Sequence, residues 1–284
     1  MMRGQKTIAT AVRRPNGEVT VQNKPLSSLY TGWVRKAPFI RGVIVLLETL
    51  VLGIGSLIYS ANVALEEEDE KITGGSIWLI LLFSMAFAVA LFFMAPLFLT
   101  KALDPYINSS LVFHLIEGGI RLAIFLGYLW IISLLPDIKR VFAYHGAEHK
   151  TLNAYESGEP LEPQAIGKYG TAHGRCGTAF LLAVLIIAIL VFSLIGRQDM
   201  WLMVLSRVLL LPVIASIGYE ATQFGSRHLK NGFIRVMMTP GLWLQRLTTR
   251  EPDDKQVEVA IAALESVLAS DREGAQSSSS PDNL

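Results

Sequence analysis

Residues 77–99, IWLILLFSMAFAVALFFMAPLFL, form a run of 23 residues without a charged side chain. An α-helix rises about 1.5 Å per residue, so this run is long enough to cross the roughly 30 Å hydrocarbon core of a bilayer. Hydrophobic residues make up 51% of the 284-residue chain, more than one water-soluble core normally uses. The sequence therefore predicts an all-α polytopic membrane protein.

Three more apolar runs are candidate spans: 39–64, 178–195 and 201–218. The region 107–135 contains His114, Glu117 and Arg121, and its uninterrupted part, 122–135, is short for a span. If it crossed, the basic loop that follows would lie outside the cell, against the positive-inside rule. We therefore expect four transmembrane helices plus a re-entrant or interfacial segment, with a fifth span as the open alternative.

Charge placement predicts the orientation. Seven Lys or Arg residues precede Pro38, whereas the connection 66–71 is acidic except for Lys71. The positive-inside rule then puts the N-terminus in the cytoplasm and the acidic connection outside, with both termini cytoplasmic in a multi-pass inner-membrane protein. Arg207 within an apolar run needs a partner, and we expect Glu48 of the first run to supply it.

The soluble parts lie at the two ends of the chain. In the segment 1–37, alternating residues flank Asn16-Gly17, which predicts a small β-hairpin. Asp253 and Gln256 predict the capped start of an amphipathic cytoplasmic helix. The expected division is 1–37, a membrane domain 38–224 that includes the cytoplasmic segment 139–176, a C-terminal region 225–270 and a disordered tail 271–284.

The segment 144–156, YHGAEHKTLNAYE, contains the residues that we expect to form the functional site. In a helix, His145, Glu148, His149 and Glu156 project from one face. The order His-x-x-Glu-His is the inverted zincin pattern, in which two imidazoles bind Zn²⁺ and the glutamate acts as general base. The competing interpretation is a solvated amphipathic helix, weakened by Gly146.

Glu156 of this segment, or one of three residues outside it, could complete a metal site. His173 and Cys176 form a His-x-x-Cys spacing, and Glu220 could be a distant third ligand. Alternatively His173 hydrogen bonds at the interface and Cys176 packs as a small hydrophobe. We expect a divalent metal, with Zn²⁺ favoured, and with Fe²⁺ or Mn²⁺ also compatible with these ligands.

These residues predict a metal-dependent hydrolase at the cytoplasmic membrane face, with Glu148 as catalytic base. The substrate could be a membrane peptide, a lipid head group or a small cytosolic amide. One alternative is a metal-stabilised scaffold or partner of another membrane protein. A transporter is a third possibility because charged residues lie within apolar segments. The scattered basic residues give no reason to expect nucleic-acid binding.

Several motifs together resemble the YqhQ family of bacterial membrane proteins. They are Met1-Met2-Arg3-Gly4, the segment 144–156, the His-x-Arg-Cys-Gly-Thr run from His173, Tyr219-Glu220 and the segment 240–254. The family is a domain of unknown function, usually described as a predicted metal-dependent enzyme, so the resemblance implies metal at His145, His149 and possibly His173. The chain departs from the family at Gly174, where members commonly have Pro. It also starts where members usually carry a further Gly-rich, Glu-containing segment, so we expect that an N-terminal segment could be missing.

Overall fold

The computed structural model describes residues 1–27, 30, 32–33, 37–64, 74–196 and 198–279. They are mostly helical and form two compact units, each assembled from segments far apart in the sequence. We call Met1–Lys71, Lys139–His173 and Thr249–Leu284 the mixed unit, because it contains strands and helices. We call Ile72–Ile138 and Gly174–Thr248 the helical unit.

The mixed unit begins with a three-stranded antiparallel sheet. Its strands are β1 (Met2–Arg3), β2 (Thr7–Arg13) and β3 (Val19–Pro25), in the order β1-β2-β3. Gly17 closes the turn between β2 and β3 with a φ of +91°, a left-handed conformation that favours glycine. The predicted hairpin is confirmed, and β1 supplies the further strand that an isolated hairpin requires for stability.

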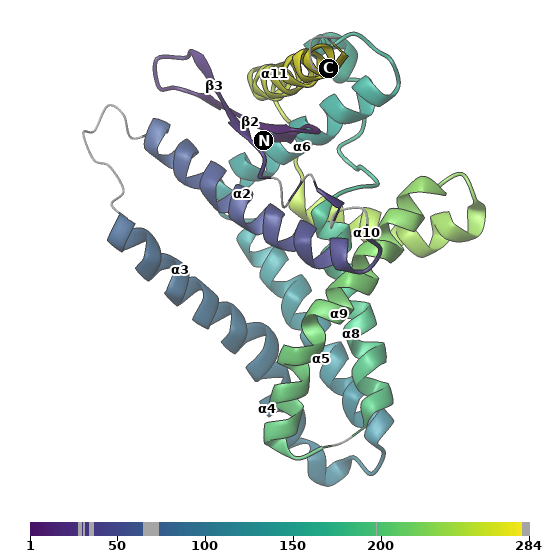
Figure 1. The fold of residues 1–284 in the computed structure, drawn as a ribbon. Coiled ribbons are helices and arrows are strands. Elements are labelled where there is room, and N and C mark those ends of the chain that lie inside the picture. Colours follow the sequence, from purple (N-terminus) through teal and green to yellow (C-terminus); the bar gives the residue numbers. More distant parts are fainter. Residues whose placement is uncertain (28–29, 31, 34–36, 65–73, 197, 280–284) are drawn as a thin grey trace. The chain divides into compact units, whose positions relative to one another are not determined.

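Two helices of the mixed unit cover opposite faces of this sheet, α2 (Ile40–Ala64) and α11 (Asp254–Ser279) (Figure 1). Successive residues of a strand point to opposite faces. Ala9 and Ala11 of β2 accordingly pack in the core that includes α11, whereas the Thr10 hydroxyl lies 2.8 Å from the Ser56 hydroxyl of α2. The sheet is therefore the middle layer of this unit.

The capping box predicted at the start of α11 is present. The carboxylate of Asp253 accepts the Gln256 N–H at 2.7 Å, and the Gln256 side-chain oxygen accepts the Asp253 N–H at 3.0 Å. The predicted apolar stripe packs into the core of the mixed unit through Val257, Ala260, Ile261, Leu264 and Leu268. The helix continues to Ser279, through part of the segment expected to be a tail, and residues 280–284 lie outside the described residues.

The central motif lies on α6 (Pro136–Glu156), which joins the same core through Ala147 and Ala154. The short helix α7 (Pro163–Ile166) adds Ile166. The chain entering α11 crosses α6 at Gly146, where a Cβ atom would overlap the carbonyl oxygen of Arg250. The glycine that weakens the helix intrinsically is therefore required for this close crossing.

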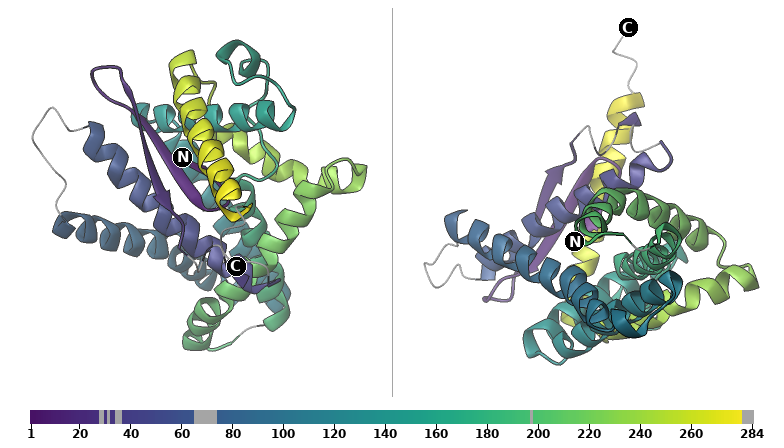
Figure 2. Two further views of the ribbon diagram at one scale, coloured as in Figure 1. Left: turned by 45° about the horizontal axis from the view of Figure 1, so that its top comes forward. Right: turned by 90° about the horizontal axis from the view of Figure 1, so that it is seen from below.

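The described part of the helical unit consists of long helices, one shorter helix and connecting turns. Its elements are α3 (Gly74–Val89), the π-helical turn η2 (Ala90–Met94), α4 (Ala95–Ala102), the 3-10 turn η3 (Asp104–Tyr106), α5 (Ser110–Ile132), α8 (Gly177–Ile195), α9 (Met200–Arg227) and α10 (Gly232–Thr248). Helix α8 packs against α5 and α9 (Figure 2). Gly118 of α5 lies against Ile189, and Gly218 of α9 against Val184, since small residues let membrane helices approach closely.

Five helices among the described residues are long and apolar enough to cross a membrane. They are Ile40–Ala64, Trp78–Ala102, Ser110–Ile132, Gly177–Ile195 and Met200–Arg227. The sequence predicted four, with 107–135 as a re-entrant or interfacial segment. The structure forms a continuous 23-residue helix, α5, over Ser110–Ile132, with His114, Glu117 and Arg121 buried in the protein.

The charged residues of the apolar helix α5 are paired with one another and with a residue of α9. The Glu117 carboxylate accepts hydrogen bonds from Arg121 at 2.6 Å and from Arg207 of α9 at 2.5 Å, and the imidazole of His114 lies 3.4 Å from it. The expectation that Arg207 pairs with Glu48 is wrong: Glu48 bonds to Arg3 at 2.6 Å. An ion pair across α5 and α9 can hold charges away from lipid.

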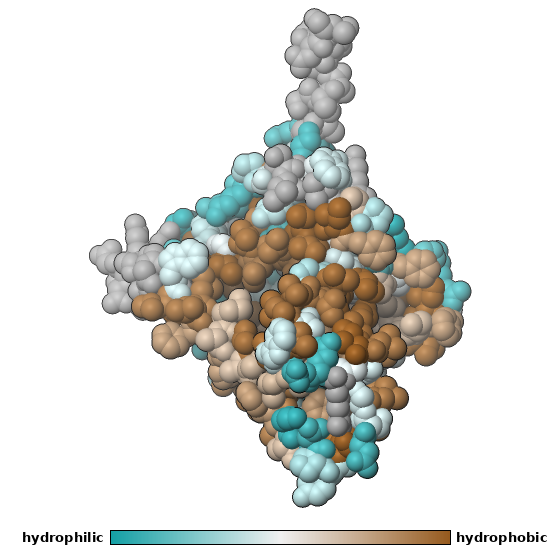
Figure 3. All heavy atoms as spheres, turned by 60° about the horizontal axis from the view of Figure 1, so that its bottom comes forward, coloured by the Kyte–Doolittle hydropathy of each residue, from teal (hydrophilic) through white to brown (hydrophobic). Residues whose placement is uncertain are grey.

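Large apolar side chains are exposed along the candidate spans. Trp78 and Phe83 of α3 are 75% and 72% exposed, and hydrophobic side chains cover much of the face drawn in Figure 3. A water-soluble protein rarely exposes apolar patches of this extent. The surface therefore fits a lipid environment.

Candidate metal centre

Two of the predicted ligands lie one turn apart on α6. The ring centroids of His145 and His149 are 4.3 Å apart, and one ring nitrogen of each lies within 4.8 Å of the other. His149 is 3% exposed, whereas His145 is partly buried. The helix thus brings two imidazoles together, as the spacing predicts.

A backbone carbonyl fixes the orientation of His149. Its Nδ1 lies 2.6 Å from the carbonyl oxygen of Thr171, and because a carbonyl can only accept, Nδ1 must carry the proton. This leaves Nε2 as the nitrogen with a lone pair. Histidines that bind metals commonly donate their other N–H to a carbonyl or carboxylate in this way.

The loop that supplies this carbonyl is tied back to α6. The side-chain amide of Asn153 donates to the carbonyl oxygens of Gly170 and Ala172, each at 3.0 Å. The Thr249 and Thr171 hydroxyls lie 3.1 Å apart. Asn153 belongs to the segment 144–156, but this role could not be predicted from the sequence. Its partners are backbone carbonyls of a loop 17 to 19 residues away, which no side-chain pattern reveals.

The same loop brings His173 to the pair on α6. Its ring centroid lies 5.7 Å from that of His149, and it is buried, with 7% of its surface exposed. Its Nε2 lies 3.5 Å from a carboxylate oxygen of Glu156, the last residue of α6. The mixed unit therefore gathers three imidazoles and one carboxylate that the sequence proposed as ligands.

Glu148 and Lys150 have neighbours of their own. The Glu148 carboxylate is partly exposed and lies 3.5 Å from the amino group of Met1. Lys150 is buried and forms an ion pair with Glu251, in the segment that crosses α6. A buried lysine next to His149 could not be predicted from the sequence, because its partner lies 101 residues away.

The two remaining predicted ligands belong to the helical unit. Cys176 is buried and caps α8, with its sulfur accepting the N–H of Thr178 at 3.4 Å. Glu220 lies on α9 and is partly buried. The alternative expectation for Cys176, a small buried side chain, agrees with this cap, and a ligand role for Cys176 or Glu220 stays a prediction.

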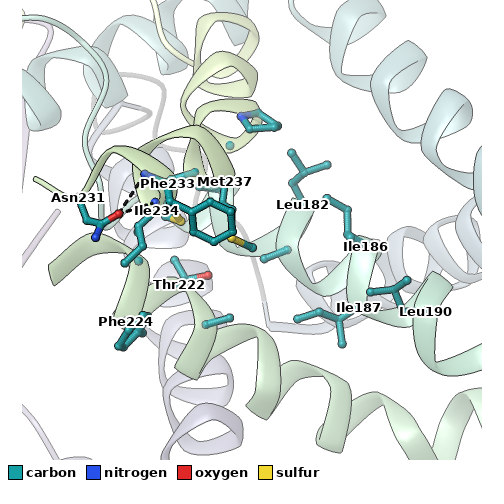
Figure 4. A pocket seen from close by; sticks show the side chains of 17 residues that line it. Leu182, Ile186, Ile187, Leu190, Thr222, Phe224, Asn231, Phe233, Ile234 and Met237 are labelled. Atoms are coloured by element: carbon teal, nitrogen blue, oxygen red, sulfur yellow. Dashed lines mark hydrogen bonds between the residues drawn. The ribbon is translucent and has the colours of Figure 1, made fainter. Parts of the chain in front are cut away.

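The helical unit also contains an apolar pocket of about 610 Å³ between α8, α9 and α10 (Figure 4). Leu182 and Ile187 line it from α8, and Phe233 and Met237 from α10. Asn231 supplies a polar group, but its side-chain oxygen already accepts the N–H of Phe233 at 3.0 Å. Among the described residues that line this pocket none has an ionisable side chain.

Comparison with known proteins supports one family. Residues 37–270 match the family described as "Protein of unknown function (DUF1385)". The chain is 34% identical over 282 residues to "Uncharacterized protein YqhQ" of Bacillus subtilis (strain 168), covering 94% of this chain and 89% of that protein. No solved structure matches the chain.

Proposed function

We propose that this chain, which belongs to the DUF1385 family of unknown function, is a metal-dependent hydrolase of the membrane surface. Its metal ligands would be His145, His149 and His173. The observation that carries the proposal is the bond from His149 Nδ1 to the Thr171 carbonyl. This hydrogen bond places the proton of His149 on Nδ1 and leaves Nε2 able to bind a metal. The Thr171 carbonyl belongs to the same loop that carries His173.

The donor set fits a divalent transition metal. Three imidazoles with an open fourth position are a common arrangement at catalytic zinc sites, and the same nitrogens suit Fe²⁺ or Mn²⁺. When bound, such a metal supplies Lewis acidity and lowers the pKa of a coordinated water to about 7. Burial of His149 and His173 limits competition from bulk water for the ligand positions.

The carboxylates of the mixed unit have separate roles in this proposal. Glu148, the acidic residue of the His-x-x-Glu-His pattern, takes a proton from the attacking water as general base. Glu156 accepts a hydrogen bond from His173 and so orients that ring. Each role predicts a different variant phenotype: loss of turnover for Glu148→Gln, and weaker metal affinity for Glu156→Gln.

We further propose that the protein is a multi-pass inner-membrane protein with both termini in the cytoplasm. The apolar helices support membrane association. The basic residues before Pro38 and in the segment 139–175 support a cytoplasmic mixed unit. A hydrolase there would act on a membrane peptide, a lipid head group or a small cytosolic amide.

The test is metal analysis of the full chain, purified in detergent without a polyhistidine tag. We expect close to one metal ion per chain in the wild type and in Glu148→Gln, and loss of metal in His149→Ala and His173→Ala. His228→Ala is the matched control, because His228 is an exposed histidine of the helical unit. A metal-free folded wild type, or full metal content in both ligand variants, would refute the proposal.

The alternative, a metal-stabilised scaffold, is favoured by one observation: Cys176 follows His173 by three residues and could close the coordination sphere. X-ray absorption separates the two cases, since Zn–S bonds are about 2.3 Å long and Zn–N bonds about 2.0–2.1 Å. A sulfur ligand that Cys176→Ser removes, with four protein ligands and no water, would favour the scaffold. Three nitrogen ligands plus an oxygen would favour the hydrolase.

A further inference from the structure

Helix α2 is one of the five helices that could cross the membrane, yet two of its polar side chains, Glu48 and Ser56, contact the sheet of the mixed unit. Glu48 is 2% exposed and its carboxylate accepts a hydrogen bond from Arg3 of β1 at 2.6 Å. The Ser56 hydroxyl lies 2.8 Å from the Thr10 hydroxyl of β2. Buried Gly42 and Val63 belong to the same side of the helix. The sheet therefore contacts the middle of α2.

The opposite side of α2 is apolar and exposed. Leu47, Leu50, Val51 and Leu57 are between 47% and 65% exposed. A helix with one polar, protein-bound side and one apolar side is typical of helices that lie in the membrane interface. A spanning helix that packs against no other spanning helix would instead meet lipid around most of its circumference.

A spanning α2 would draw the sheet into the hydrocarbon. Glu48 and Ser56 lie about 6 Å on either side of the helix centre, at 1.5 Å per residue. Arg3 and Thr10, which contact them, would then lie near the bilayer midplane together with the open edge of a three-stranded sheet. Unpaired strand edges and charged side chains are excluded from lipid-exposed positions at that depth.

We propose that α2 does not cross the membrane but lies in the cytoplasmic interface, with its apolar side in contact with the lipid surface. The crossings can then be counted from the core of the mixed unit. Met2 and Ala9 of the sheet, Ala147 of α6 and Val257 of α11 pack in one core, so these three elements lie on one side of the membrane. An even number of crossings must separate each from the next.

The helices of the helical unit supply those crossings. The continuous helix of α3, η2 and α4 and the helix α5 lie between α2 and α6, and α8 and α9 lie between α6 and α11. Two crossings in each interval satisfy the count only if α2 makes none. The basic segment 139–175 then lies in the cytoplasm although α5 crosses the membrane. A crossing α5 is therefore compatible with the positive-inside rule, and the segment 107–135 need not be re-entrant. The acidic connection 66–71, which lies outside the described residues and which the charge pattern placed outside the cell, is then cytoplasmic.

Cysteine labelling of the full chain in intact cells tests this arrangement, with a membrane-impermeant maleimide. Native Cys176 is buried, and the unsubstituted chain gives the blank. We expect labelling of Tyr106→Cys, which lies between α4 and α5, and no labelling of Glu67→Cys or Glu159→Cys until the cells are permeabilised. Labelling of Glu67→Cys in intact cells, or failure to label Tyr106→Cys, would overturn the proposal.

A depth measurement gives an independent answer. Spin labels at Leu47, Val51 and Leu57 in protein reconstituted into vesicles should all show the same shallow depth by collision with oxygen and with a water-soluble nickel complex. A spanning helix would separate the outer two positions by about 15 Å along its axis. A steady change in depth from 47 to 57 would refute the interfacial placement, whether or not the protein binds metal.

Discussion

The close crossing at Gly146 gives a prediction whose size can be worked out. In Gly146→Ala the new methyl group overlaps the carbonyl oxygen of Arg250, and this segment is held by the bond from Arg250 N–H to the Phe142 carbonyl at 2.9 Å and by the Lys150–Glu251 ion pair. Overpacking costs about 1–3 kcal/mol, and loss of the hydrogen bond about 1 kcal/mol. The better helix propensity of alanine offsets about 1 kcal/mol. The net loss of unfolding free energy is therefore about 2 kcal/mol.

Thermal unfolding in detergent, followed by tryptophan fluorescence, measures this loss. For a chain of this size about 2 kcal/mol corresponds to a fall in Tm of roughly 4–8 °C. Gly127→Ala on α5 is the matched control, since in the described part of the chain a Cβ there meets no atom within 4 Å. Its Tm should stay the same or rise slightly. Equal Tm values for the two variants would refute the close crossing of α6.

Three further results are expected. Glu117→Gln removes the carboxylate that Arg121 and Arg207 share, and breaking a buried ion pair costs about 3–5 kcal/mol. The variant should therefore unfold at a lower SDS concentration than Arg121→Met, which keeps the pair between Glu117 and Arg207. Unfolding of Arg121→Met at the lower SDS concentration would contradict this. Asn153→Ala releases the loop carbonyls and should weaken metal binding in a competition titration while circular dichroism stays unchanged. A chelator should lower the Tm of the wild type, because it removes a metal whose binding stabilises the folded state. It should leave the Tm of His149→Ala unchanged, since that variant has no bound metal to lose; equal shifts would argue against the site.

The features that the sequence predicted well are local. The turn at Asn16-Gly17 and the capping box of Asp253 and Gln256 each depend on a few adjacent residues, and both form as expected. The helical spacing likewise brought His145 and His149 together. Such signals need no knowledge of which segments meet in space.

The features that could not be predicted from the sequence are contacts between distant segments. Arg207 needed an acidic partner, and Glu48 was the wrong choice because Glu117 lies on the neighbouring helix while Glu48 faces the sheet. The orientation of His149 depends on a backbone carbonyl, which no side-chain pattern reveals. The sequence left a continuous helix over α5 as the less favoured alternative, since its charged residues look unfavourable in lipid until their partners are known.

The interleaved path of the chain has a consequence for biogenesis. The sheet forms from the first 25 residues, but its packing partner α11 begins at Asp254, and Gln5 bonds to Asp271 across 266 residues. The ribosome must therefore deliver all of the candidate spans before the core of the mixed unit can close, and until then the N-terminal sheet has an uncovered apolar face. Burial of that face would therefore mark a chain whose synthesis has passed α11, and an unfinished chain would remain exposed to chaperones and proteases.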